Sequence, residues 1–257
     1  MARWTAPDGI SIAYDVAGPA DAPAIVLQHG FGSNRRNNWV RFGFVDALLA
    51  AGKRVVTVDA RGHGESDKPH DSAFYGEARM AADLAGIADA LGLGSFDLAG
   101  YSMGAIVSLL LAAADRRVRR LVIGGVGEGV VAKGGVDIRA IPGGAIVAAL
   151  LAEDPAAVPP PGAVFRAFVD ANGGDRFALA AQARAAHQGS IPLDRVTMPS
   201  LVIAGDRDPL AVRPEVLARA LPDARLLLLE GDHLGAFADP RFVPALVDFV
   251  SAVEHRP

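Results

Sequence analysis

Short, continuous apolar runs alternate with segments of helical periodicity along most of the chain. The apolar runs lie at 24–27, 54–58, 96–99, 120–123, 200–204 and 225–229. Strands that are covered on both faces have this composition, because neither face meets water. The helical patterns lie at 39–51, 76–91, 105–114, 214–221 and 240–254. The alternation predicts an α/β fold, in which a mostly parallel central sheet carries helices on both faces.

The first residues follow a different pattern. Arg3–Thr5 and Ile10–Tyr14 are short runs on either side of Asp8-Gly9, and the second run alternates apolar and polar residues. Alternation over a few residues is typical of a half-buried strand, and Asp-Gly is a preferred hairpin turn. We therefore expect an antiparallel β-hairpin at this end of the sheet.

One interval interrupts the alternation of strands and helices. About 70 residues separate the runs that end near 123 and begin near 200, which is far longer than an ordinary connection. Three helical patches, 145–151, 163–171 and 176–187, carry enough apolar residues to argue against disorder. We expect residues 1–125 and 196–257 to form the α/β core, and 126–195 to form a helical lid, or cap, inserted into it.

Composition narrows the classes of partner. The 257 residues are 51% hydrophobic and carry a net charge of −4, so charge gives no reason to expect binding to nucleic acid or to an anionic membrane surface. There is no cysteine, which excludes disulfides, thiolate metal sites and a cysteine nucleophile. No apolar run approaches 18 residues, and the first residues lack the apolar segment of a secretory signal. We expect a cytoplasmic protein of undetermined oligomeric state.

The pentapeptide Gly100-Tyr101-Ser102-Met103-Gly104 has the Gly-x-Ser-x-Gly form. An apolar strand precedes it and a helical segment of small and apolar residues follows it. A sharp turn from strand to helix needs glycines on both sides, because a Cβ there would collide with its neighbours. The turn lifts the serine hydroxyl above the sheet, beside a helix N-terminus that favours negative charge. Ser102 is therefore the candidate nucleophile.

A serine hydroxyl is a poor nucleophile until a base accepts its proton and an acid orients that base. His233 is the candidate base, because it follows the last predicted strand and lies at the edge of the sheet where α/β folds bind ligands. Asp208, in the loop after the strand at 200–204, is preferred as the acid over Asp206. Glu128, after the strand at 120–123, is a third possibility.

The order Ser102, Asp208, His233 is that of the α/β-hydrolase nucleophile elbow. Together with the strand pattern, it makes the chain resemble the α/β-hydrolase fold superfamily, specifically its serine-nucleophile esterases, enol-lactonases and carbon–carbon hydrolases. The resemblance extends over almost the whole chain. The matching segments are His29-Gly30-Phe31-Gly32, Asp59 to Ser66, Gly100 to Gly104, Gly205 to Pro209 and Gly231-Asp232-His233.

The resemblance implies a site and a chemistry. The backbone N–H groups of Phe31 and Met103 would form the oxyanion hole. The expected protein is a serine hydrolase that cleaves a carboxylic ester or lactone of a small, largely apolar substrate, with no cofactor and no metal. The alternatives are a carbon–carbon hydrolase of a diketone-type ring-fission product, a cofactor-free perhydrolase with haloperoxidase-like activity and a small-molecule receptor. Relatives that open epoxides or displace halide have aspartate where this chain has Ser102.

Several polar residues near these motifs admit two interpretations. Arg35 and Arg36 could bind a substrate carboxylate, but a solvated or helix-capping role is favoured. His29 is expected to be structural, and Asp59 and Arg61 are expected to lock their loop through hydrogen bonds. A catalytic role for His63 is not favoured. The remaining histidines, His70, His187 and His255, are expected at the surface.

Overall fold

A computed structural model describes residues 1–137, 139, 141 and 144–252, and within them the expected α/β fold is confirmed. Eight strands form one sheet in the order β1-β2-β4-β3-β5-β6-β7-β8. β1 pairs with β2, and β2 with β4, in antiparallel fashion, whereas the other pairs are parallel. The strands are β1 (Ala2–Thr5), β2 (Ser11–Ala17), β3 (Ala24–Gln28), β4 (Arg54–Val58), β5 (Phe96–Tyr101), β6 (Val118–Gly124), β7 (Ser200–Gly205) and β8 (Ala224–Leu229).

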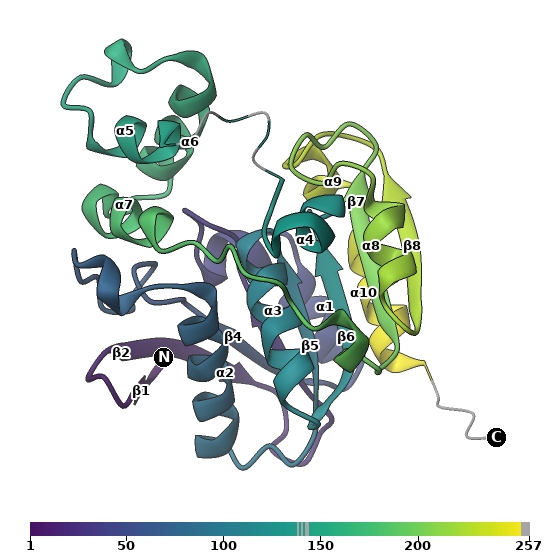
Figure 1. Ribbon diagram of the computed structural model, residues 1–257. Coiled ribbons are helices and arrows are strands. Elements are labelled where there is room, and N and C mark those ends of the chain that lie inside the picture. Colours follow the sequence, from purple (N-terminus) through teal and green to yellow (C-terminus); the bar gives the residue numbers. More distant parts are fainter. Residues whose placement is uncertain (138, 140, 142–143, 253–257) are drawn as a thin grey trace.

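Helices connect the strands and cover both faces of the sheet (Figure 1). The α-helices are α1 (Phe44–Ala50), α2 (Glu77–Ala90), α3 (Met103–Ala114), α4 (Glu128–Lys133), α5 (Ala145–Leu151), α6 (Pro160–Ala171), α7 (Arg176–Arg184), α8 (Pro214–Ala220), α9 (Gly235–Ala238) and α10 (Phe242–Ser251). The structure also contains one π-helical turn, η1 (Arg36–Val40). Its described residues form three 3₁₀ turns, η2 (Ser72–Phe74), η3 (Pro155–Ala157) and η4 (Leu193–Arg195). None of the helices described has both the length and the apolar character needed to cross a bilayer.

The apolar strands divide their side chains between two cores. Val26 of β3 belongs to the core beneath α2, α3 and α8, whereas its neighbours Ile25 and Leu27 belong to the core beneath α1 and α10. Successive side chains of a strand point to opposite faces, so a strand between two helix layers must be apolar at every position. This explains why the central strands have continuous rather than alternating apolar sequences.

Two local expectations meet different outcomes. The hairpin is confirmed, with Trp4 paired to Ile12 across β1 and β2. The single helix expected over 39–51 is wrong, because the structure has η1 and α1 with a break between them. Gly43 precedes α1 in the left-handed conformation, with φ 77°, which ends one helical segment and starts another in a new direction.

The interval between β6 and β7 contains α4 to α7, with α5 to α7 gathered beyond one end of the sheet (Figure 1). The three expected helical patches are present as α5, α6 and α7, whereas α4 was not expected. Leu150, Val169 and Leu179 form a small apolar cluster of their own. α7 also reaches the main core through Ala178 and Ala181. Residues 138, 140 and 142–143 of this interval lie outside the described residues.

Candidate active site

The strand order creates a crevice between β3 and β5. β4 follows β3 in the chain but pairs on its other side, so the connections after β3 and β5 leave in opposite directions. Ligands in open α/β sheets bind at such a switch point, beyond the carboxyl ends of the strands. The turn after β3 carries Phe31, and the turn after β5 carries Ser102. A Cβ added to Gly30 would lie 3.4 Å from the Cβ of Ser102, so the two turns are in contact.

Ser102 occupies a strained turn between β5 and α3. Its backbone has φ 57° and ψ −117°, a conformation that residues with side chains rarely adopt. A Cβ on Gly100 would overlap the carbonyl oxygen of Gly104, and one on Gly104 would overlap that of Gln28. Both glycines are therefore needed for the close packing of α3 on β3 and β5. The predicted elbow geometry is present, with Ser102 at its apex.

The two residues expected to form the oxyanion hole both border the cavity at this turn. Phe31 and Met103 line the same cavity as Ser102. Within the described part of the chain, neither the N–H of Phe31 nor that of Met103 donates to another residue. Both are therefore available to an acceptor in the cavity, and Met103 begins α3, where the helix dipole adds positive potential.

His233 and Asp208 are brought together by the loops after β8 and β7. The Nδ1 atom of His233 lies 2.8 Å from Oδ2 of Asp208. The Asp208 side chain is fully buried, and its other oxygen accepts the Leu210 N–H at 2.8 Å. Because the carboxylate accepts, the proton of a neutral His233 is held on Nδ1, and Nε2 is left as the acceptor.

Tyr101 connects this pair to the nucleophile turn. Its hydroxyl donates to the carbonyl oxygen of His233 at 2.6 Å, and the two rings lie 5.1 Å apart. Tyr101 directly precedes Ser102, so the His233 loop is anchored next to the elbow. Burial raises the pKa of the Tyr101 hydroxyl well above its usual value, which keeps this donor protonated.

The other acid candidates are engaged elsewhere. Asp206 accepts the Gly231 N–H at 2.9 Å and so joins the acid loop to the base loop without touching the imidazole. Glu128 forms ion pairs with Arg139 and with Arg213. Of the three carboxylates left open by the sequence, Asp208 is the one bonded to His233.

His29 and His63 support the turn after β3. His29 is fully buried, with Nδ1 bonded to the Gly30 oxygen at 2.8 Å and Nε2 accepting the Ala60 N–H at 3.0 Å. His63 Nε2 accepts the Gly32 N–H at 3.1 Å. Burial lowers the pKa of His63 to about 3, so the ring stays neutral and can accept this bond. Both imidazoles therefore have structural bonds, as expected for His29.

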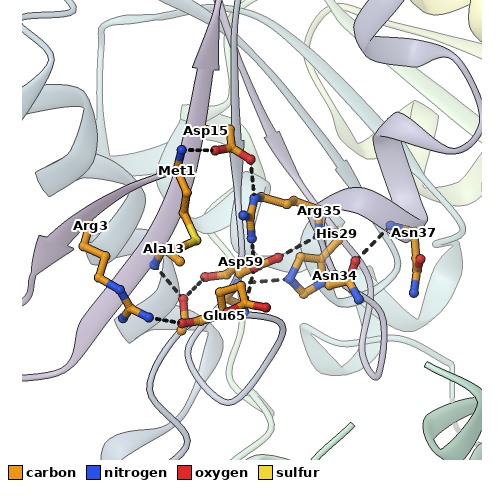
Figure 2. Close-up of polar contacts among 12 residues, drawn as sticks. Met1, Arg3, Ala13, Asp15, His29, Asn34, Arg35, Asn37, Asp59 and Glu65 are labelled. Atoms are coloured by element: carbon orange, nitrogen blue, oxygen red, sulfur yellow. Dashed lines mark hydrogen bonds and ion pairs between the residues drawn. The ribbon is translucent and has the colours of Figure 1, made fainter. Parts of the chain in front are cut away.

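Arg35 is part of a buried ionic network and does not line the Ser102 cavity (Figure 2). The solvated or helix-capping role favoured for it is therefore wrong, since its side chain is buried and makes no cap bond. Its guanidinium pairs with Asp59 and donates from Nε to Asp15 at 2.8 Å. Asp59 also accepts the Arg35 N–H and the Glu65 N–H, each at 2.8 Å. The network joins the segment after β3 to the loop after β4. Arg61, with its bonds to Asp83, locks the same loop from the other side.

The remaining cationic candidates differ in exposure. Arg36 is exposed and is not among the residues that line the Ser102 cavity. His70 is exposed and pairs with Asp175, as expected for a surface histidine. His187 was expected at the surface, but this is wrong, because it is partly buried and lines the cavity. His255 lies outside the described residues.

The cavity has a volume of about 490 Å³ and lies between the core and the interval from β6 to β7. Much of its wall is apolar, including Ile106 from α3, Ile146 and Val147 from α5 and Phe165 from α6. Sequence reasoning missed two polar residues in this wall, Glu77 and Gln182. No group of three or more potential metal ligands occurs within the residues described.

Comparison with known proteins places these features in a wider context. A family profile described as the alpha/beta hydrolase fold matches residues 23–126. The chain is 44% identical over 96 residues to the sn-1-specific diacylglycerol lipase ABHD11 of Mus musculus, a match covering 37% of this chain and 29% of that protein. It is 39% identical over 115 residues to 2-hydroxy-6-oxo-2,4-heptadienoate hydrolase of Pseudomonas putida, covering 44% of this chain and 41% of that protein.

A solved structure extends the similarity over the full length. A hydrolase from Pseudomonas aeruginosa superposes with a TM-score of 0.78 at 29% identity, with 98% of each chain covered. By contrast, the chain spans less than half the length of the curated relatives that it matches. The sequence similarity to those relatives is therefore confined to one part of each protein.

Proposed function

Because this chain belongs to the α/β-hydrolase fold superfamily, we propose that it is a serine hydrolase of carboxylic esters or lactones of small, largely apolar substrates. The observation that carries the proposal is the 2.8 Å bond from His233 to a fully buried Asp208, in loops beside the strained turn of Ser102. A base oriented by a buried acid, together with a serine that lines a cavity, is the arrangement that acyl transfer requires.

The proposed reaction proceeds in two halves. His233 Nε2 accepts the proton of Ser102 while Oγ attacks the substrate carbonyl carbon, and Asp208 stabilises the imidazolium. The N–H groups of Phe31 and Met103 donate to the oxyanion of the tetrahedral intermediate. The imidazolium then protonates the departing alkoxide, which leaves an acyl-enzyme. Water, deprotonated by the same imidazole, attacks the acyl carbon and releases the acid and Ser102.

The apolar wall of the cavity supports an apolar substrate, because burying its surface on binding is favourable. Residues 126–195 are proposed to act as the lid over a core of 1–125 and 196–257. Their contribution of Ile146, Val147 and Phe165 to the cavity wall supports this division. A lid in this position would exclude water from the ester during acylation.

A short p-nitrophenyl ester tests the proposal. Wild-type protein is expected to hydrolyse p-nitrophenyl butyrate and to react with a fluorophosphonate, with the label mapping to the peptide that contains Ser102. Ser102→Ala should abolish both. Ser108→Ala, which changes a buried serine of α3 outside the cavity lining, should retain both. Equal turnover by wild type and Ser102→Ala would refute the proposal.

Carbon–carbon cleavage is the second candidate, and the similarity to a 2-hydroxy-6-oxo-2,4-heptadienoate hydrolase favours it. The same serine, histidine and acid would be used, so the nucleophile variants do not separate the two activities. Parallel assays with p-nitrophenyl butyrate and 2-hydroxy-6-oxo-2,4-heptadienoate distinguish the two activities. A kcat/KM for the dienoate above that for the ester would make carbon–carbon hydrolysis the main activity.

A further inference from the structure

One wall of the cavity is polar. Glu77 is the first residue of α2, Gln182 lies near the end of α7, and His187 follows α7. All three line the cavity that holds Ser102. Glu77 is 6% exposed and Gln182 is 1% exposed, so neither is a surface residue that happens to border the space. We call these three residues the polar wall.

The orientation of the Gln182 amide is determined by its neighbours. Its Nε2 donates to Glu77 Oε1 at 3.5 Å and lies 3.4 Å from Met103 Sδ. The reversed amide would set a carbonyl oxygen against a carboxylate oxygen, so the assigned orientation is the favourable one. Gln182 Oε1 is then left buried, and no described residue donates to it.

His187 also has a buried polar atom without a hydrogen-bond partner among the described residues. The backbone N–H of His187 donates to Glu77 Oε2 at 2.6 Å, which fixes the position of this residue. Its Nε2 is buried and has no hydrogen-bond partner among the described residues. Glu77 thus holds Gln182 and His187 in place, and each has one buried polar atom without a partner among the described residues.

Two such atoms in one cavity need an explanation. A buried polar group without a partner costs about 1–3 kcal/mol, and proteins leave few of them. The rest of the wall includes Ile106, Val136, Ile146 and Phe165, which offer no hydrogen bonds. Lys133 and Gln188 also line the cavity, but no described residue bonds to either atom, which leaves a molecule that enters the cavity as the missing partner. Since Gln182 Oε1 can only accept, that partner must carry a hydrogen-bond donor.

We propose, on the basis of the proposed serine-hydrolase function, that the polar wall selects a substrate carrying a hydroxyl group on its otherwise apolar chain. A hydroxyl donates its one proton to Gln182 Oε1 and can accept a hydrogen bond from His187 when the ring proton is on Nε2. An ammonium can only donate. Lys133 also lines the cavity, and its positive charge repels a cation.

Matched esters test the proposal. One series is p-nitrophenyl hexanoate with its 6-hydroxy and 6-amino derivatives, and the other is the hexanoate esters of hexanol and 1,6-hexanediol. In wild-type protein, kcat/KM for the hydroxylated ester is expected to exceed that of its parent by about tenfold in one of the series. Gln182→Leu should remove this preference, so that the hydroxylated ester and its parent have kcat/KM values within about threefold of each other.

Two further variants keep the test informative. His187→Phe removes the second polar atom but keeps the backbone N–H that Glu77 accepts, so it should weaken the preference even if Gln182→Leu fails to fold. Ile146→Val changes the apolar wall of the same cavity and should keep the preference. Melting temperatures identify any variant that has lost its fold.

The outcomes separate this proposal from the proposed function. The selective role of the polar wall is refuted if the parent esters are hydrolysed and the hydroxylated esters are not preferred. It is also refuted if both polar-wall variants keep the preference. In either case the proposed serine-hydrolase function stands. Preference for the amino ester over the hydroxy ester overturns the choice of hydroxyl. If no ester is cleaved and the fluorophosphonate does not label Ser102, the proposed function fails and this proposal fails with it.

Discussion

A Cβ added to Gly104 would overlap the carbonyl oxygen of Gln28, because α3 begins directly against the end of β3. Gln28 is the last residue of β3, and Gly104 is two residues beyond Ser102. The close approach brings the turn after β3 next to the nucleophile turn. The same approach therefore sets the position of Ser102 relative to the N–H of Phe31.

Gly104→Ala is expected to destabilise the protein. The obstructing atom belongs to the backbone and cannot rotate away, so helix and strand must separate, at a cost of about 2–3 kcal/mol. For a chain of this size, the melting temperature should fall by about 5–10 °C. Gly94→Ala is the control, because a Cβ there meets no atom within 4 Å. Equal melting temperatures for the two variants would mean that the packing at Gly104 is looser than described.

Asp208→Asn is expected to lower kcat for ester hydrolysis by about 10⁴-fold with little change in KM. The amide has the shape of the carboxylate but no longer stabilises the imidazolium or holds the required tautomer. Asp206→Asn is the matched control, since Asp206 lies in the same loop and bonds to the Gly231 N–H instead of the imidazole. Steady-state kinetics with p-nitrophenyl butyrate measures both. A similar loss in the two variants would contradict the role assigned to Asp208.

The main features of the fold could be predicted because they depend on local sequence. The apolar run 24–27 indicates a strand covered on both faces, and Gly100 and Gly104 mark the elbow whatever the rest of the chain does. The break at Gly43 could not be predicted with the same ease, since a glycine within an apolar periodic segment is also compatible with a continuous helix. The short α4 has too few residues for its periodicity to be distinctive.

The polar wall could not be predicted from the sequence, for a different reason. Glu77 and Gln182 are 105 residues apart, and they meet only because the fold brings the last turn of α7 to the start of α2. A carboxylate at the first position of a helix is ordinary, because it complements the helix dipole. Gln182 lies among alanines of α7, with no motif around it. Only the tertiary structure reveals that both line the cavity with Ser102.

Arg35→Ala is expected to destabilise the protein by about 3–5 kcal/mol. It removes the guanidinium that pairs with the fully buried Asp59 and leaves that carboxylate without its cation. Arg36→Ala changes an exposed neighbour and should stay within about 0.5 kcal/mol of wild type. Urea unfolding at neutral pH measures both free energies. If the two variants unfold at the same urea concentration, the Arg35 network contributes no net stability.

His63 makes the stability of the protein depend on pH. Burial lowers the pKa of its imidazole from 6.5 to about 3 in the folded chain, whereas the unfolded chain keeps the ordinary value. Between these two values the unfolded state binds the extra proton, so stability is fully present above pH 6.5 and is lost as the pH falls. From pH 7 to pH 5, this one group should remove about 2 kcal/mol.

His63→Gln is expected to flatten that dependence, because an amide oxygen can accept the Gly32 N–H without binding a proton. Part of the dependence of stability on pH should remain in this variant, because burial lowers the pKa of His29 as well. Melting temperatures recorded from pH 7.5 to pH 5 should therefore converge for wild type and His63→Gln towards the acid end. The exposed His70 provides the control, and His70→Gln should follow the wild-type curve. An unchanged slope in His63→Gln would show that His63 already binds a proton in the folded protein at mildly acidic pH.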